Sequence, residues 1–594
     1  MPISALYEHY KRVFQQRLSS VDALPQLAIL GLISGSVTAL VIILFRFCIE
    51  WPLGWLLPNG DPENFEGLSQ LMRVSLPLTG AVLIGIIWYR LQISQRKVGV
   101  AFVMERLNYH QGYISFRSLV TQFVGGVLTL TSGQSAGREG PAVHLGAACS
   151  SLMGQKLKLP NNSIRVLISC GTAAAISASF NTPIAGVIFA MEVVMMEYTI
   201  TGFTPVILAS VAAAIITQAV YGNEPAFLVP QLFMNSLWEV PFVVLCGVLI
   251  GLASAGFVGL LRHSMHYTHY SIFYRIMAAG TITAAGALLF PEIMGIGYDT
   301  VNAALLGQMG VYTLLGIAAF KIVITATSVG LGMPNGLVGP TLFIGATLGG
   351  AMGLISNWLM PELSSSTGFY AMLGMGAMMG SVLQAPLAAL MALLELTHNP
   401  NIILPGMLII VVSSMVASEG FKQRSVFLTI LQEQGLDYQN SPVTQALQRV
   451  GVAAIMEREF VQSDKTIDLA TAKALLRKQP KWILINNSSG KAISLLPTAD
   501  LARFLEENEA AFIAAEEDPM QERMLINLLE IPAQRKDVAP VYFQATLQEA
   551  LDRFNESGTE ALFVERTSAP MIKRVVGIVT RTDIENYYQY KGQA

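Results

Sequence analysis

The chain has 594 residues, of which 53% are hydrophobic and 13% are charged, and its formal net charge is −3. Soluble proteins carry roughly 25% charged residues, so this composition is typical of a membrane protein, and the small negative charge argues against a nucleic-acid partner. The four cysteines are scattered through apolar segments without a CxxC pair or a Cys/His cluster, so we predict no metal site.

The chain begins with a polar stretch that favours a helix, and we predict an N-terminal helix over residues 1–25. Its basic residues precede the first apolar run, which favours a cytoplasmic N-terminus. Apolar segments then fill residues 26–430. Some are long enough to cross a bilayer, and others are cut by Gly or Pro, as half-helices are. We predict a membrane domain here, made of two repeats at about 26–225 and 235–430.

Two motifs in this region share a Gly-Pro step at the start of an apolar helix. Residues 137–141 read Gly-Arg-Glu-Gly-Pro, and residues 336–340 read Gly-Leu-Val-Gly-Pro, 199 positions later (336 − 137). The first copy carries the charged pair Arg138-Glu139 where the second carries Leu337-Val338. A repeated broken helix within a membrane indicates a transporter built from two structural halves, with its site at the breaks.

A second motif also recurs, in the same order. Pro183 is followed nine residues later by Glu192, and Pro386 is followed nine residues later by Glu395. The offset is 203 positions (386 − 183), close to that of the Gly-Pro motif, so we predict an internal duplication. These residues alone leave open whether the halves are inverted or parallel, although inverted repeats are common in transporters.

Charges become frequent near the end of the apolar region. We predict a linker at 431–444 and then a soluble α/β domain at 445–594. Apolar alternation and amphipathic helices divide this domain into two β-α-β-β-α units, at about 445–510 and 525–594. The expected strands include residues 482–485, 492–495, 561–564 and 575–579.

The Gly-Pro helix starts favour an anion. Free backbone N–H groups and the positive end of the helix dipole attract negative charge, and two such ends can hold an ion weakly enough to release it. Glu139, when ionised, could occupy and block this site, and when protonated it would leave. The alternative is a structural pairing of Glu139 with Arg138 or with the helix start. For Arg138 we favour a structural ion pair or a snorkelling role.

Residues 137–141 resemble the GREGP signature of the CLC family of chloride channels and proton/chloride antiporters. Residues 336–340 are similar to the family's GxFxP motif, and residues 183–192 and 425–427 also follow family patterns in family order. The resemblance covers about residues 26–435. It implies an α-helical polytopic fold with an inverted repeat and broken helices, assembled as a homodimer with one anion pathway per subunit.

The resemblance also implies which residues hold the anion. They are Val98, Gly99, Arg138, Glu139, Gly140, Leu337, Val338, Gly339 and Phe427, with Glu139 as the proton-sensitive gate. The sequence departs from the family where Val98 replaces a Ser, Val338 replaces a Phe, and Phe427 replaces a Tyr. Because two hydroxyl donors are missing, we expect weak discrimination among chloride, nitrate, bromide and bicarbonate.

Val193 stands where many antiporters of the family carry an internal proton-transfer glutamate. The resemblance implies anion transport coupled to proton counter-movement, and a passive gated anion channel, such as a voltage-gated one, is the alternative. A divalent-cation transporter regulated by CBS domains is a remote alternative. We do not expect an enzyme, because no hydrolase or paired-carboxylate motif accompanies Glu139.

The soluble tail resembles a tandem pair of CBS domains, which implies an α/β fold. Thr580 and Asp583 fit the family's nucleotide-binding end of the second unit, whereas Pro497 stands where the first unit would carry Thr. An adenine nucleotide is therefore one hypothesis, and a pair that only packs against its dimer mate is the other. Transport itself is expected to need no cofactor. We expect a multi-pass protein of the inner (plasma) membrane with a cytoplasmic CBS pair, whose partners are a monovalent anion, protons, lipid and a second copy.

Overall fold

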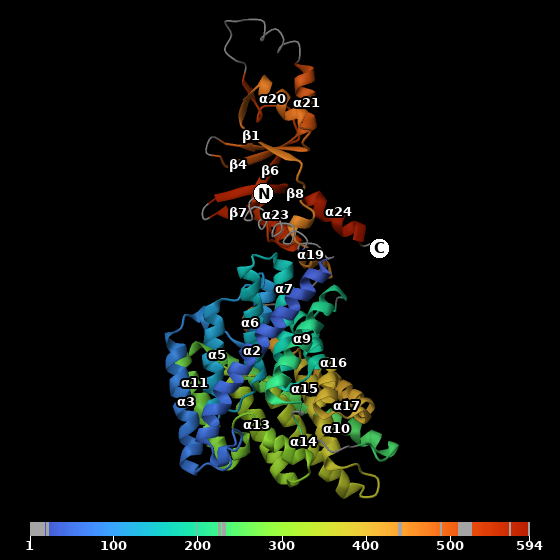
Figure 1. Ribbon diagram of the computed structural model, residues 1–594. Helices are drawn as coiled ribbons and strands as arrows, with labels where there is room; N and C mark the ends of the chain where they lie inside the picture. Colours follow the sequence, from blue (N-terminus) through green and yellow to red (C-terminus); the bar gives the residue numbers. More distant parts are fainter. Residues whose placement is uncertain are drawn as a thin grey trace. The chain divides into compact units, whose positions relative to one another are not determined.

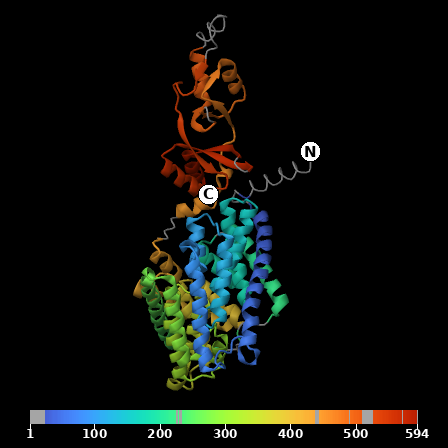
Figure 2. The same ribbon diagram turned by 90° about the vertical axis from the view of Figure 1, so that its left-hand side faces the viewer.

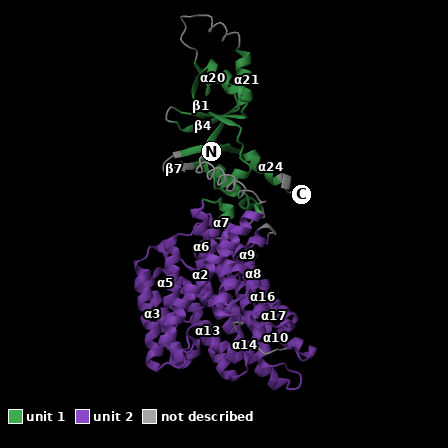
Figure 3. Ribbon diagram, viewed as in Figure 1, with its two compact units in different colours: residues 1–23, 158–163, 440–594 green, residues 24–157, 164–439 purple. Residues whose placement is uncertain are grey.

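The computed structural model describes residue 18, residue 227 and most of the remaining chain. The continuous described segments are 23–198, 200–223, 233–436, 442–487, 490–508, 525–569 and 572–591. The expected N-terminal helix over 1–25 lies almost entirely outside them. The chain divides into two compact units, one made of residues 1–23, 158–163 and 440–594, and the other of residues 24–157 and 164–439 (Figure 3).

The larger unit is a bundle of helices that run beside one another (Figures 1 and 2). The first repeat contains α2 (Leu24–Leu56), α3 (Gln70–Arg90), α4 (Gly99–Tyr109), α5 (Phe116–Thr131), α6 (Glu139–Lys156), α7 (Asn161–Phe180), α8 (Pro183–Phe189) and α9 (Ile200–Tyr221). The second contains α10 (Val240–Met265), α11 (Ile272–Leu289), α12 (Tyr298–Leu305), α13 (Val311–Gly330), α14 (Val338–Leu359), α15 (Thr367–Leu383), α16 (Pro386–Thr397), α17 (Ile403–Met415) and α18 (Val426–Glu433).

Within the described residues, nine helices are long and apolar enough to cross a membrane. The Gly-Pro motifs open α6 and α14, and the Pro…Glu motifs open α8 and α16, which are short. Short apolar helices that start inside a membrane protein are tolerated where neighbouring helices bury them. The molecule is therefore a multi-pass membrane protein with broken helices, as the sequence predicts.

The duplication is visible in how helices pack. A Cβ on Gly146 of α6 would lie 2.2 Å from the carbonyl oxygen of Gly171 on α7, and a Cβ on Gly345 of α14 would lie 2.2 Å from that of Gly374 on α15. Small residues of this kind let helix backbones approach closely. The same glycine contact thus recurs in both repeats, at the offsets found in the sequence.

The turns that follow these helices also match. Asn181 after α7 has φ of 59°, and Gln384 at the end of α15 has φ of 52°. Each left-handed residue ends its helix, and a proline then opens the next helix at Pro183 or Pro386. Proline is suited to the first helical turn because no intrahelical partner is lost there.

The smaller unit contains a six-stranded sheet in the order β1-β3-β4-β6-β7-β8. Its strands are β1 (Phe460–Asp464), β3 (Trp482–Asn486), β4 (Ala492–Pro497), β6 (Lys536–Tyr542), β7 (Ala561–Ala569) and β8 (Ile572–Thr580). The order reads as two three-stranded halves, each with one parallel and one antiparallel pair, joined by the antiparallel β4–β6 pair. A separate ribbon pairs β2 (Thr466–Asp468) with β5 (Leu525–Asn527).

Helices accompany both halves of this sheet. They are α19 (Pro442–Gln448), α20 (Leu469–Arg477), α21 (Thr498–Glu507), α23 (Leu547–Ser557) and α24 (Arg581–Lys591). Asp468 caps α20, and Thr546 with Glu549 forms a capping box on α23. The predicted strands are confirmed in position, but β7 ends five residues later and β8 starts three residues earlier than expected. The short β2–β5 ribbon carries no clear alternation and was not predicted.

Candidate functional site

The two Gly-Pro motifs meet in space. Gly137 and Gly336, which are equivalent positions in the two copies, form an isolated antiparallel bridge, and the Gly137 amide donates to the Gly336 carbonyl at 3.1 Å. Antiparallel pairing of equivalent residues is what a local two-fold axis produces. The starts of α6 and α14 are therefore brought to one point, as the repeat predicts.

Glycine is required at this meeting point by space. A Cβ on Gly336 would lie 2.4 Å from the Gly137 carbonyl oxygen, and a Cβ on Gly140 would lie 2.7 Å from the Gly336 Cα. Asn335 adds a side-chain bridge, because its amide donates to the Ser135 carbonyl at 2.7 Å. The two motifs thus share one compact backbone contact.

Glu139 is the first residue of α6 and is fully buried. Its Oε2 accepts the Gly339 amide of the second motif at 3.0 Å, and its Oε1 accepts the Tyr298 hydroxyl at 2.5 Å. A carboxylate is a hydrogen-bond acceptor through both oxygens. The side chain therefore lies across the start of α14, in the place that an anion attracted to that helix end would take.

Arg138 precedes Glu139 and is mostly buried. Its guanidinium donates to the Ser179 carbonyl at 3.0 Å, lies 3.7 Å from the Glu50 carboxylate, and stacks over the Tyr298 ring with its Cζ 5.3 Å from the ring centroid. These contacts tie α6 to α2 and α7. They are the structural pairing that the sequence favours for Arg138.

Tyr298 was not found by the sequence reasoning. It opens α12 after Gly297, outside both repeated motifs, and nothing in its spacing links it to Glu139. The Gly-Ile-Gly-Tyr-Asp string at 295–299 marks a turn before a helix. Only the fold, however, brings that turn to the carboxylate.

The start of α4 lies near the same point. Val98 is the residue before the helix, and Gly99, the first helical residue, has φ of 83°. The Gly99 amide donates to Gln122 Oε1 at 2.8 Å and to His144 Nδ1 at 3.1 Å. His144 is fully buried and also bonds to the Ser118 hydroxyl at 3.0 Å. The Gly99 amide is therefore engaged by side chains here.

A cavity of about 490 Å³ gathers most of the predicted anion-binding positions. Its lining includes Val98, Gly99, Gly140, Leu337 and Phe427, together with the basic residues Arg96, Lys97 and Arg275 and one carboxylate, Glu433. The basic side chains outnumber the acidic one, so the charged lining is net positive and attracts anions. Arg138, Glu139, Val338 and Gly339 do not line it.

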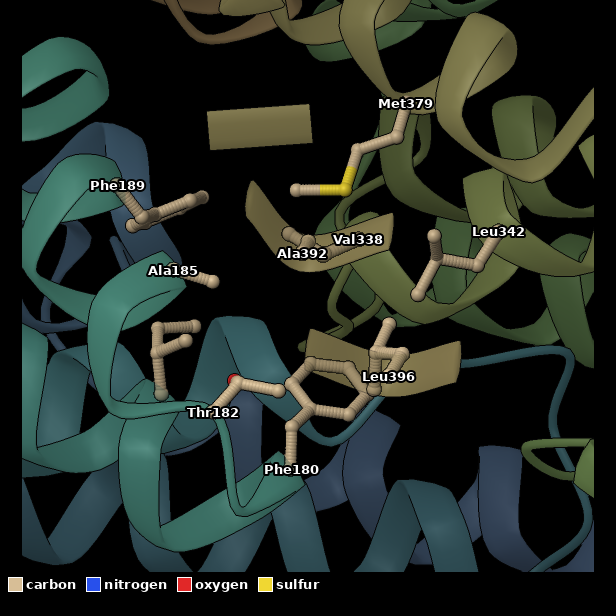
Figure 4. A pocket seen from close by; sticks show the side chains of 10 residues that line it. Phe180, Thr182, Ala185, Phe189, Val338, Leu342, Met379, Ala392 and Leu396 are labelled. Atoms are coloured by element: carbon tan, nitrogen blue, oxygen red, sulfur yellow. The ribbon is translucent and has the colours of Figure 1, made fainter. Parts of the chain in front are cut away.

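Val338 lines a different and much smaller cavity, of about 10 Å³, which is roughly the space of a single water. Figure 4 shows Ala185 and Phe189 of α8 opposite Val338 and Leu342 of α14, with Phe180 nearby. Apolar side chains form nearly all of this lining. The substitution of Val for the family's Phe is thus accommodated by apolar packing.

Three carboxylates gather near the start of α12. The Asp299 amide donates to Glu63 in the α2–α3 loop at 3.2 Å. Burial raises the pKa of Glu63 to about 7, against the opposing effect of Arg138, and burial with the nearby Asp299 charge raises the pKa of Glu66 to about 8. The pKa of Asp299 is also raised, mainly by burial.

The second repeated motif forms a reciprocal pair of helix caps. Glu192 accepts the Leu387 and Ala388 amides of α16 at 3.3 and 2.6 Å, and Glu395 accepts the Ile184 and Ala185 amides of α8 at 2.9 and 2.7 Å. Carboxylates satisfy the free amides of a helix start and complement its dipole. Each repeat thus caps a helix of the other.

In the smaller unit, Thr580 and Asp583 lie together at the start of α24. Asp583 Oδ2 accepts the Thr580 amide at 2.8 Å and the Thr580 hydroxyl at 2.6 Å. The equivalent position in the first half is Pro497, which offers no side-chain cap to α21. The two halves therefore differ at the position that the sequence singles out.

Comparisons with known proteins agree with this architecture. A family model described as "Voltage gated chloride channel" matches residues 80–418. A "Putative chloride channel protein ClcB-like" from Ralstonia nicotianae is 33% identical over 393 residues, which cover 64% of this chain and 91% of the relative. An "H(+)/Cl(-) exchange transporter ClcA" from Vibrio cholerae serotype O1 is 31% identical over 300 residues, covering 49% of this chain and 64% of the relative.

A solved structure extends the likeness to the fold. The crystal structure of "a slow cyanobacterial Cl-/H+ antiporter" matches with a TM-score of 0.61 and 22% identity, covering 69% of this chain and 98% of that chain. The chain belongs to the voltage-gated chloride channel family, CLC, and has the CLC transporter fold.

Proposed function

We propose that this protein carries chloride or a related monovalent anion across a bilayer, with Glu139 as a protonatable gate that couples anion passage to proton counter-movement. The observation that carries the proposal is the position of the Glu139 side chain. Its buried carboxylate lies across the Gly339 amide at the point where two helix starts meet. At the level of the family, the relatives' names describe chloride transport and proton exchange rather than enzymes.

The geometry supplies the two elements that such a gate needs. The ionised carboxylate satisfies the same N–H donor that an anion would use, so the two compete for one place. Protonation removes the negative charge and therefore the main attraction to the helix end. One side chain can thus exchange a proton for an anion at a single position.

Flux from proteoliposomes tests the proposal. Full-length protein is reconstituted with chloride inside, efflux is started with a potassium ionophore, and chloride and external pH are recorded together. We expect chloride efflux accompanied by proton uptake. In Glu139→Gln, anion flux should continue while proton movement is lost, because a carboxamide neither takes up nor releases a proton.

The matched control is Glu362→Gln, which changes an exposed carboxylate in the α14–α15 loop and should keep both fluxes. Absence of flux for chloride, bromide and nitrate from wild-type vesicles would overturn the proposal. Retained proton coupling in Glu139→Gln would remove Glu139 from the gate while leaving transport intact.

A passive anion channel is the second candidate. It is favoured by Val193, which is buried where many antiporters of the family have a proton-transfer glutamate, and by the apolar lining of the small cavity beside Val338. In the same vesicles, a channel would release chloride without any pH change. The wild-type pH trace therefore decides between the two.

We propose weak selectivity for the central part of the pathway. Val98 and Phe427 line the large cavity and provide no hydroxyl donor to an anion. Nitrate and bromide should then pass at rates within a few-fold of chloride. Strong preference for chloride over nitrate would contradict this expectation.

The smaller unit is proposed to be a CBS pair that binds an adenine nucleotide beside Thr580 and Asp583, on the cytoplasmic side of the inner membrane, in a homodimer. The support is the paired sheet halves and the Thr580–Asp583 contact.

Calorimetry of the full-length protein with ATP tests whether the nucleotide binds, and Asp583→Asn is the variant expected to lose binding. No heat at millimolar ATP would leave a CBS pair that only packs against its dimer mate.

A further inference from the structure

The turn before α12 is fixed in place by buried contacts. Lys321 of α13 is fully buried and donates to the Ile293 and Gly295 carbonyls at 2.8 and 3.2 Å. The Gly295 carbonyl also accepts the Ala136 amide at 3.3 Å, one residue before the first Gly-Pro motif. The turn is thus tied both to α13 and to the chain that leads to Glu139.

Tyr298 is held at the end of this turn. Gly297 has φ of 78°, and a Cβ there would lie 2.6 Å from the Phe343 ring, so this position requires glycine. Its backbone conformation sets the direction of the chain at Tyr298. The Tyr298 ring packs edge-on against Phe227 at 5.1 Å, and the Arg138 guanidinium lies over it. The hydroxyl is therefore presented at one fixed place.

Two donors converge on the Glu139 carboxylate. The Tyr298 hydroxyl reaches Oε1 at 2.5 Å and the Gly339 amide reaches Oε2 at 3.0 Å. The space around the carboxylate is bounded by glycines, because a Cβ on Gly137 would lie 2.5 Å from Oε2 and one on Gly339 would lie 2.8 Å from it. A small anion has room there only when the carboxylate has left.

Departure of Glu139 would leave these two buried donors without their acceptor. A buried donor without a partner is costly, so the vacated position favours an occupant that accepts both bonds. A monovalent anion does so and restores the negative charge. The same O–H and N–H that seat the gate would then hold the transported ion.

We propose that Tyr298 is the side-chain ligand of the anion at the position that Glu139 vacates, and that it serves the gate and the anion in turn. The inference rests on the proposed function and adds a residue that determines affinity at this position. It also places the polar side-chain contact away from Val98 and Phe427, which line the large cavity without a hydroxyl. Affinity for the anion would then be set beside Glu139.

Chloride binding to the detergent-solubilised full-length protein, measured by calorimetry, tests the proposal. Glu139→Ala should bind chloride more tightly than wild type, because the competing carboxylate is gone. Adding Tyr298→Phe to that variant should weaken binding about tenfold or more, as expected for loss of one hydrogen bond to a charged group. When Glu139 is present, Tyr298→Phe should change chloride affinity less. The Glu139 carboxylate, which competes with chloride, also loses its hydrogen bond from the Tyr298 hydroxyl.

The chain offers a matched control. Tyr370 is also a buried tyrosine whose hydroxyl donates to a buried carboxylate, that of Glu239, at 2.7 Å. Tyr370→Phe in the Glu139→Ala background should leave chloride affinity unchanged. Phe227→Leu, which loosens the packing of the Tyr298 ring but keeps the hydroxyl, should cost less than Tyr298→Phe.

The outcomes separate this inference from the proposed function. If Glu139→Ala binds no chloride, bromide or nitrate, the anion site itself is refuted and this inference falls with it. If Glu139→Ala binds chloride and Tyr298→Phe does not weaken it, only the role of Tyr298 is refuted. Tyr298→His, which keeps a ring N–H donor, should recover part of the affinity that Tyr298→Phe loses. A loss in Phe227→Leu as large as that in Tyr298→Phe would point to packing of the ring instead and would overturn the proposal.

Discussion

The starts of α6 and α14 lie against each other through equivalent glycines, yet only the α6 copy carries ionisable side chains. In the α6 copy, Glu139 reaches across to the amide of Gly339. In the α14 copy, Val338 at the position that matches Glu139 lines an apolar cavity of about 10 Å³ (Figure 4). One copy thus supplies the amide donor at Gly339, and the other supplies the carboxylate that accepts from it, so the two copies of one backbone differ in chemistry.

The shared backbone contact is the part of this comparison with the largest expected effect. Gly336→Ala places a Cβ 2.4 Å from the Gly137 carbonyl oxygen, a backbone atom that cannot turn away. We expect a loss of about 3 kcal/mol of stability, as for other overpacked cores. Thermal unfolding in detergent measures it.

The control is Gly256→Ala on α10, where an added Cβ meets no heavy atom within 4 Å. That change should be neutral or stabilising by up to about 1 kcal/mol, because alanine favours a helix. Equal stabilities of the two variants would show that the motifs do not touch as described.

The caps provide a comparison in which the two copies are expected to behave alike. Glu192→Ala and Glu395→Ala each remove two hydrogen bonds to the start of a helix in the other repeat. Each should lower stability by about 1–2 kcal/mol, and by similar amounts. The control is Glu419→Ala, which changes an exposed carboxylate and should alter stability by less than about 0.5 kcal/mol. A large effect of one cap and none of the other would break the symmetry.

An effect no larger than that of the caps, and dependent on pH, is expected from the carboxylates near the start of α12. The pKa of Glu63 is raised from 4.5 to about 7. Between about pH 4.5 and pH 7, the folded protein therefore keeps a proton on this carboxyl group that the unfolded chain has released. Stability contributed by this group therefore falls as pH rises from about 4.5 through 7.

Glu63→Gln should flatten this dependence, with a gain of about 1–2 kcal/mol relative to wild type at pH 8 and little difference at pH 5. Thermal unfolding at both pH values measures the difference, and Glu362→Gln, which changes an exposed carboxylate, is the control. A variant curve parallel to that of wild type would place Glu63 in solvent.

Much of the fold could be predicted from the sequence because duplication leaves a record in spacing. The offsets of 199 and 203 positions correctly identify the helices that begin at Glu139, Pro183, Val338 and Pro386. Alternation in the tail likewise locates the strands of both sheet halves. These features are local, so a linear pattern suffices to find them.

What the sequence could not provide were contacts between segments that share no pattern. Tyr298 lies 159 positions from Glu139, in a turn that resembles many others, and only the packing of α12 brings its hydroxyl to the carboxylate. The capping partners of Glu192 and Glu395 were hidden for the same reason, although their common spacing from proline was visible. The shared spacing from proline shows that Glu192 and Glu395 occupy equivalent positions in the two repeats. The fold shows which helix start each of them caps.

The exchange of caps between repeats has a consequence for how the protein is made. The amide of Ile184 finds its acceptor at Glu395, 211 positions further along the chain. At roughly 5–20 residues per second of synthesis, the first half must wait on the order of 10–40 seconds with open amides at the start of α8. Chains interrupted between the halves would therefore keep the Ile184 and Ala185 amides at the start of α8 without their acceptor.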